Sequence, residues 1–282
     1  MQKKIVLALF VMVTTFGIYF AVKINSVPTI TYFPLEYGTS FVDAKTTLER
    51  TNEDGSKASY SINWDVTSKT EEVLYLRQDV SLLFGNGQVL GMRSQWKEDA
   101  DTIHFSENIK EENELKWESI TFHYGEIHKN EDSIRSIQKL SQDTMFVIKE
   151  NNAFNSFHKP ETTNQANSIA KLDTLTQKKL LAHWQDLLFH FHLDINDYYS
   201  IPLTDLYEYQ AKAFPSFDKR SSDRIMGQLW EGIYKNYIIP YIGSKEKLEG
   251  YIPLILIEKE GNHLLVLFEM NGQKEKLIQK IR

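Results

Sequence analysis

The sequence predicts a single N-terminal transmembrane helix followed by an α+β ectodomain. Three patterns indicate this: an unbroken apolar run near the start, period-two alternation in the middle, and helical periodicity followed by short strand-like runs toward the end. They divide the chain into an anchor at 1–23, a β-rich extracytoplasmic module at 24–150, a linker at 151–171 and an α+β extracytoplasmic module at 172–282.

The anchor is the apolar run Ile5–Val22. As a helix it would measure about 27 Å, which crosses a thin hydrocarbon core if Lys4 and Lys23 extend toward the headgroups. Lys3 and Lys4 precede the run, whereas only Lys23 follows it closely. Because positive charge is retained in the cytoplasm, we expect a single-pass protein of the cell membrane with a cytoplasmic N-terminus and an extracytoplasmic C-terminal domain.

The alternative for this segment is a cleaved export signal, because lysines followed by an apolar stretch also begin such signals. Ile18, Tyr19 and Phe20 continue the apolar block where a signal peptide should turn polar, which favours an uncleaved anchor. The chain has no cysteine, so a lipoprotein signal is excluded.

The charge is unevenly distributed along the 282 residues, whose formal net charge is −6. Residues 24–150 contain 22 acidic and 13 basic side chains, while residues 151–282 contain 16 of each. An acidic membrane-proximal half repels nucleic acid and anionic headgroups, so we expect no nucleic-acid partner and membrane contact through residues 5–22 alone.

The module at 24–150 reads as antiparallel strands. Tyr60 and Ile62 share one face of Ser59–Val66, and Gly85-Asn86-Gly87 supplies a reversing turn between two apolar-rich runs. The predicted strands, with one helix-compatible acidic stretch at Asn108–Lys116, are Val73–Phe84, Gln88–Trp96, Thr102–Phe105, Trp117–Tyr124, Ile134–Leu140 and Thr144–Lys149. Their spacing favours a sandwich or meander.

The range 151–171 is rich in Asn, Thr and Ser and predicts a linker, and the apolar period then becomes helical. One stripe runs from Leu180 to Phe191, and a second runs from Ile225 to Tyr237 after the capping candidates Ser221, Ser222 and Asp223. Turn sequences separate the strand-like runs Tyr251–Ile257, His263–Phe268 and Lys274–Ile281. We therefore expect two to three helices on an antiparallel β-meander.

The sequence has no GxSxG, no phosphate-binding loop and no thiol. Two matches to SxxK, at Ser136–Lys139 and Ser244–Lys247, lack the partner motifs of a penicillin-binding enzyme and are interpreted as chance. His183, His190 and His192 lack the spacing of metal ligands on one helix, so we expect no metal, no cofactor and no catalytic residue. Asp194 and Asp197, next to two tyrosines, leave open the alternative of a hydrolase that acts on wall glycan or peptide.

The expected function is that of a non-catalytic accessory or regulatory protein that binds another membrane or envelope protein. A lysine-rich, cysteine-free chain with one anchor has the general appearance of a Gram-positive envelope protein. Aromatic side chains are enriched at binding hot spots. The candidate binding residues are Phe189, Tyr198, Tyr199, Tyr207 and Tyr209. The alternatives are the hydrolase described above and a small-ligand sensing domain.

Overall fold

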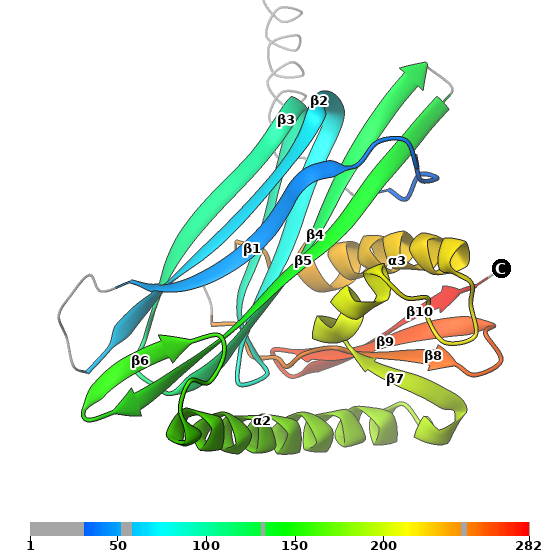
Figure 1. The fold of residues 1–282 in the computed structure, drawn as a ribbon. Helices are drawn as coiled ribbons and strands as arrows, with labels where there is room; N and C mark the ends of the chain where they lie inside the picture. The colour runs from blue at the N-terminus through cyan, green and yellow to red at the C-terminus, as the bar shows by residue number, and fades with distance from the viewer. Residues whose placement is uncertain (1–30, 52–57, 131–132, 244–246, 282) are drawn as a thin grey trace, which may run out of the picture.

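The computed structural model describes residues 31–51, 58–130, 133–243 and 247–281. The predicted anchor, Ile5–Val22, lies outside these ranges. Within them, no helix combines the length and the apolar character that crossing a bilayer requires. The described chain is mostly antiparallel β-sheet with few helices, as expected for a β-rich α+β protein (Figure 1).

The first half forms a six-stranded antiparallel sheet. Its strands follow the order β1-β2-β4-β5-β6, with β3 paired to β2. They are β1 (Phe41–Thr51), β2 (Tyr60–Gly85), β3 (Gln88–Glu111), β4 (Leu115–Asn130), β5 (Ser133–Glu150) and β6 (Ala153–Phe157).

The predicted hairpin is confirmed between β2 and β3. Gly85 pairs with Gln88, and the two turn residues have positive φ angles, 48° at Asn86 and 80° at Gly87, which the chosen residue types accept. The helix-compatible stretch Asn108–Lys116 is not helical, because β3 continues to Glu111 and β4 begins at Leu115. Pairing with β2 favours the strand over a helix here, because Tyr60 of β2 lies opposite Glu111.

Strand β2 takes part in two layers of the large sheet, one with β1 and one with β4. The candidate site lies in the interior between these layers. The first part of β2 pairs with β1, its last part pairs with β4, and its pairing with β3 is irregular between Lys69 and Leu74. Strand β1 therefore crosses the inner face of β4 and β5, as Figure 1 shows. The Leu48 N–H of β1 donates to Asp143 Oδ2 of β5 at 2.7 Å, which ties the layers together.

The second half contains helices and a four-stranded antiparallel sheet of order β10-β9-β8-β7. Its elements are α2 (Thr163–His190), η1 (Ile195–Asp197), β7 (Tyr198–Pro202), η2 (Leu203–Gln210), α3 (Lys219–Ile233), η3 (Tyr234–Ile238), β8 (Leu254–Glu258), β9 (His263–Met270) and β10 (Gln273–Lys280). The predicted meander is present as β8–β10, and β7 extends it. The α3 helix starts one turn earlier than expected, because Asp218 caps the Ser221 N–H at 2.7 Å.

The range 151–171, predicted to be a linker, contains β6 and the beginning of α2. Phe154 of β6 is buried against Tyr60, with ring centroids 4.7 Å apart, and Thr162 caps the helix by accepting from the Gln165 N–H. The cap stabilises the first turn of α2 without large apolar residues in that turn. The polar composition of the range therefore suggested a linker although the helix begins within it. Whether the modules at 24–150 and 172–282 fold separately stays a prediction.

The largest hydrophobic cluster includes residues from both of those modules. Trp230 of α3 stacks on Phe122 of β4, with ring centroids 5.2 Å apart and planes 6° from parallel. On β8, Ile255 faces this cluster, whereas Leu254 packs with Leu187 of α2. Because both faces of the small sheet are covered at its centre, the strands β8 and β9 are apolar over most of their length.

Candidate functional site

The outer edge of β5 is the first candidate, because other backbone segments of the described chain pair with it only at its two ends. The inner edge pairs with β4 along most of the strand. On the outer edge, the Ser136 N–H donates to Pro34 O at 3.0 Å and Ser136 O accepts from the Glu36 N–H at 2.8 Å. Strand β6 pairs with Phe146–Glu150. Between Ser136 and Phe146, no strand of the described residues pairs with this edge.

A side chain occupies the middle of this edge. The Leu140 N–H donates to Gln210 Oε1 at 2.7 Å, and Gln210 Nε2 donates to Leu140 O at 2.8 Å. The side-chain amide of Gln210 thus makes the same two hydrogen bonds, one donated and one accepted, that one residue of a neighbouring strand would make with Leu140. Because backbone groups alternate in direction along a strand, Gln138 and Gln142 present their N–H and C=O groups on the same edge as Leu140.

Two cavities line this edge, and we call them together the β5 groove. One, of about 330 Å³, includes residues 137–140 of β5; the other, of about 490 Å³, includes residues 139–143. They share Lys139 and Leu140. The β5 groove therefore consists of two cavities that both reach Lys139 and Leu140 and together cover residues 137–143 of β5.

The structure brings two of the five predicted binding residues to the β5 groove. Tyr207 lines the larger cavity and is 39% exposed, while Tyr209 lines the smaller one. Both belong to η2, the same element that carries Gln210. Tyr209 stacks on Phe214 with centroids 4.8 Å apart, and Lys212 Nζ lies 4.7 Å from the Tyr209 ring centroid, so this ring is held in place.

The other three predicted residues lie on different elements. Phe189 is 81% exposed near the end of α2. Tyr198 and Tyr199 belong to β7. The Tyr198 hydroxyl lies 3.3 Å from His263 Nε2, and Lys259 Nζ lies 5.9 Å from the centroid of the Tyr199 ring. The five aromatic residues thus do not form one patch, because strand alternation and the turn after α2 separate them.

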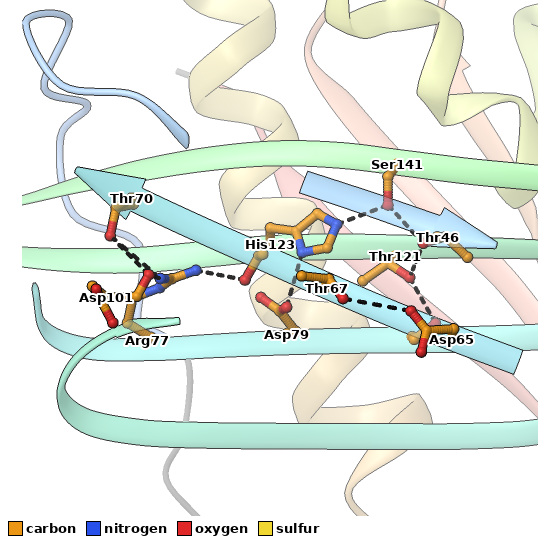
Figure 2. Close-up of polar contacts among 12 residues, drawn as sticks. Thr46, Asp65, Thr67, Thr70, Arg77, Asp79, Asp101, Thr121, His123 and Ser141 are labelled. Atoms are coloured by element: carbon orange, nitrogen blue, oxygen red, sulfur yellow. Dashed lines mark hydrogen bonds and ion pairs between the residues drawn. The ribbon is translucent and has the colours of Figure 1, made fainter. Parts of the chain in front are cut away.

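A second candidate is a polar network between β1 and the sheet, shown in Figure 2. Alternate side chains of β2, β4 and β5 point into this interior, and several of them are buried and polar. Thr46 Oγ1 of β1 lies 2.7 Å from Thr121 Oγ1 and 2.6 Å from Ser141 Oγ, and Ser81 Oγ lies 2.7 Å from Thr121 Oγ1. These hydroxyls form one hydrogen-bonded chain.

The hydroxyl chain leads to a buried histidine and aspartate. His123 Nε2 lies 2.7 Å from Ser141 Oγ, and His123 Nδ1 lies 3.0 Å from Asp79 Oδ2. The side chains of His123 and Asp79 are 0% exposed. Ser141 is 6% exposed and lines the larger cavity of the β5 groove. The order from the cavity inward is serine, histidine, aspartate.

Arg77 provides the positive charge nearest to this network along β2. It is completely buried, its guanidinium donates to Ser68 Oγ, Thr70 Oγ1 and Asp101 O, and its Cζ lies 5.1 Å from the Phe41 ring centroid. Burial lowers the pKa of Arg77, and the charge of Asp79 opposes that shift. A buried carboxylate and guanidinium at alternate positions of one strand partly compensate each other.

The sequence did not reveal this network because Asp79, His123 and Ser141 are far apart along the chain and match no local motif. One signal was available for two of them: Asp79 and His123 are polar residues within the predicted strands Val73–Phe84 and Trp117–Tyr124. Ser141 follows the predicted strand Ile134–Leu140 and carried no such signal. The acids considered for a sugar cleft behave differently, since Asp194 accepts from the Asn196 N–H and caps η1. Within the described ranges, no three His, Asp or Glu side chains are placed to share a metal ion.

Comparison with protein-family models, with curated proteins and with solved structures finds no match for this chain.

Proposed function

We propose that this chain is a membrane-anchored extracytoplasmic accessory or regulatory protein, and that it binds an extended segment of another envelope protein along the β5 groove. The observation that carries the proposal is the outer edge of β5, which lacks a strand partner among the described residues between Ser136 and Phe146. An exposed strand edge accepts an extended peptide through main-chain hydrogen bonds.

The groove offers recognition as well as backbone pairing. Tyr207 and Tyr209 flank the edge in separate cavities, so alternate side chains of a bound strand would meet different surroundings. Tyrosine contributes large contact area with few rotatable bonds, which suits a binding hot spot. Gln210 already pairs with Leu140, and an incoming strand would displace or extend this pairing.

The position of the groove relative to the predicted anchor supports a membrane-bound partner. The eight residues between Val22 and Thr31 span at most about 30 Å when extended. Thr31 O accepts from the Tyr124 hydroxyl at 2.7 Å, and the Tyr32 N–H donates to Glu231 Oε2 at 2.8 Å, so the chain is fixed to the body there. Leu35 then pairs with Ser136 at one end of the groove. A tether of this length raises the effective concentration of the groove for other membrane proteins.

Site-specific crosslinking in native membranes tests the proposal. The chain has no cysteine, so an introduced cysteine is its only thiol. Thr47→Cys places a reporter in the lining of the larger cavity, and Lys178→Cys places a control on the exposed side of α2. Each full-length variant would be treated with a thiol-attached photocrosslinker in its native membrane.

We expect a discrete crosslinked membrane or envelope protein from the Thr47→Cys reporter and none from Lys178→Cys. Adding Tyr207→Ala and Tyr209→Ala to the reporter should reduce the yield at least about tenfold, because loss of hot-spot rings costs more than about 1.4 kcal/mol. Equal yields from both reporters, or a yield that the tyrosine substitutions leave unchanged, would contradict the proposal.

A further inference from the structure

We propose that Ser141, His123 and Asp79 form a nucleophilic site for acyl and phosphoryl esters that enter the larger cavity of the β5 groove. This activity goes beyond the accessory role and rests on the chemistry of these three groups, and it uses the larger cavity of the same β5 groove. The Ser141 hydroxyl lies 2.7 Å from His123 Nε2, a spacing at which an imidazole can take the proton of a serine. On the other side of the ring, His123 Nδ1 lies 3.0 Å from Asp79 Oδ2, which is an ion-pair distance without hydrogen-bond alignment.

The burial of the groups follows their roles. The side chains of Asp79 and His123 are 0% exposed, and Asp79 Oδ2 lies 3.0 Å from His123 Nδ1. Within the described part of the chain, neither Asp79 oxygen nor His123 Nδ1 makes a hydrogen bond. Ser141 is the outermost of the three and reaches the cavity of about 490 Å³. A nucleophile at the cavity wall, with its base behind it, is what attack on a bound ester requires.

The cavity also supplies hydrogen-bond donors for a developing oxyanion. The backbone N–H of Gln142, the residue after Ser141, belongs to the outer edge of β5, and Lys139 and Tyr207 line the same cavity. Backbone N–H groups and cationic side chains near a serine nucleophile stabilise the negative charge of a tetrahedral intermediate. The local sequence lacks GxSxG because Ser141 lies within a strand and not on a strand-to-helix turn.

The chemical step balances with the residues present. Ser141 Oγ forms a bond to the ester carbon while its proton moves to His123 Nε2; the ester C–O bond then breaks and the alcohol leaves with that proton. Water hydrolyses the acyl-serine by the same proton transfers and releases the carboxylic acid. Asp79 is a positioning residue, because its carboxylate lies 3.0 Å from His123 Nδ1 and would stabilise the imidazolium that forms, without contacting the substrate.

A fluorophosphonate is the probe, because it captures the first half of this reaction. The Ser141 Oγ–P bond forms, the P–F bond breaks, fluoride leaves and the hydroxyl proton goes to His123. The full-length protein, kept in detergent micelles, would be incubated with the probe, and the modified residue identified by peptide mass mapping. This localisation in the unsubstituted protein does not depend on whether any variant folds.

We expect one adduct, located on Ser141. His123→Gln should slow its formation by roughly 10²–10⁴-fold, the usual contribution of a general base. Ser119→Ala removes another buried hydroxyl of the same sheet, one that donates to Leu82 O, and should leave the rate unchanged. Asp79→Asn should lower the maximal inactivation rate without changing the probe concentration that gives half of it, which a general loss of packing would not do.

An absence of any adduct on Ser141 in the folded protein would overturn the inference. So would an adduct that forms on Ser141 at the same rate in His123→Gln, because the hydroxyl would then react without its base.

Discussion

At the scale of single residues, Trp230 connects the two sheets. Its ring is completely buried, stacks on Phe122 of the large sheet, and belongs to the cluster that also contains Ile255 of the small sheet. Aromatic stacking of this kind adds to the free energy gained from burial. The indole N–H has no hydrogen-bond partner within the described part of the chain.

Trp230→Ala should lower the free energy of unfolding by about 3–5 kcal/mol, because it leaves a large cavity in the shared core. Trp230→Phe keeps an aromatic ring on Phe122 and removes the unpaired N–H, so its cost should be less than half of that. Urea unfolding monitored by circular dichroism measures both values. Equal losses for the two variants would contradict the view that ring packing dominates at this position.

Glu126 gives a pH-dependent contribution to stability. It is 7% exposed, and burial raises its pKa, although His128 Nε2 at 3.2 Å opposes the shift. Because the folded state holds this proton more tightly than the unfolded state, the contribution is full below the unfolded pKa of about 4.3 and is lost as pH rises through the raised value.

Glu126→Gln carries no titrating group and should therefore gain stability relative to the natural chain between pH 4 and pH 7. Urea midpoints of both proteins at the two pH values give the difference. Glu112→Gln, at an exposed position, controls for the loss of one negative charge. A stability difference that does not change with pH, or that changes in the opposite direction, would show that burial does not raise the pKa of Glu126.

At the scale of elements, η2 is held against β5 by the amide of Gln210. Removing its two hydrogen bonds with Leu140 should cost about 1–2 kcal/mol of unfolding free energy and should expose the Leu140 N–H to exchange. Gln142→Ala, an exposed glutamine of the same edge, should change stability by less than about 0.5 kcal/mol. Hydrogen exchange and urea unfolding of Gln210→Ala test this; an unchanged Leu140 exchange rate would contradict it.

Local signals predicted several elements correctly, because each has its cause in neighbouring residues. The Asn86-Gly87 turn, the Leu180–Phe191 stripe and the β8–β10 runs follow from turn chemistry and apolar period. The end of β3 at Glu111 and the start of β4 at Leu115 were missed, because they depend on pairing with β2 and β5. The helix start at Thr163 was missed because a single cap determines it. The intrinsic helix propensity of an acidic stretch is small compared with the stabilisation from strand pairing, so the stretch does not form a helix.

The candidate site could be predicted only in part. Tyr207 and Tyr209 were selected as aromatic residues, and they lie in the β5 groove. The edge itself was not predictable, because the absence of a neighbouring strand depends on how distant segments pair. The same holds for Ser141 and His123, which meet only when β4 and β5 align with Thr121 opposite Ser141.

At the scale of the whole molecule, the proposed orientation is one span with the β-rich body outside the cytoplasm. Alkaline phosphatase fused after residue 282 should be active in a bacterial host, because this enzyme matures only after export. A green fluorescent protein fused at the same point should stay dark when exported through the same route. An inactive phosphatase together with a fluorescent partner fusion would contradict the orientation.

Backbone pairing at the β5 edge is what distinguishes the proposed binding mode from adhesion through aromatic side chains. Proline at position 142 removes the N–H on the outer edge, and strand edges accept proline where the N–H faces solvent. Alanine at the same position keeps the N–H and removes the same side chain. The pair of variants therefore isolates a single hydrogen-bond donor.

The most direct measurement is the crosslinking yield of the Thr47→Cys reporter in native membranes with Gln142→Pro or Gln142→Ala added. Strand addition predicts that Gln142→Ala keeps the yield and Gln142→Pro lowers it at least about fivefold, as expected for one lost hydrogen bond of about 1 kcal/mol and the disturbed pairing around it. Thermal unfolding of both variants verifies that the fold is retained. Equal yields from the two folded variants would contradict partner binding through the edge of β5.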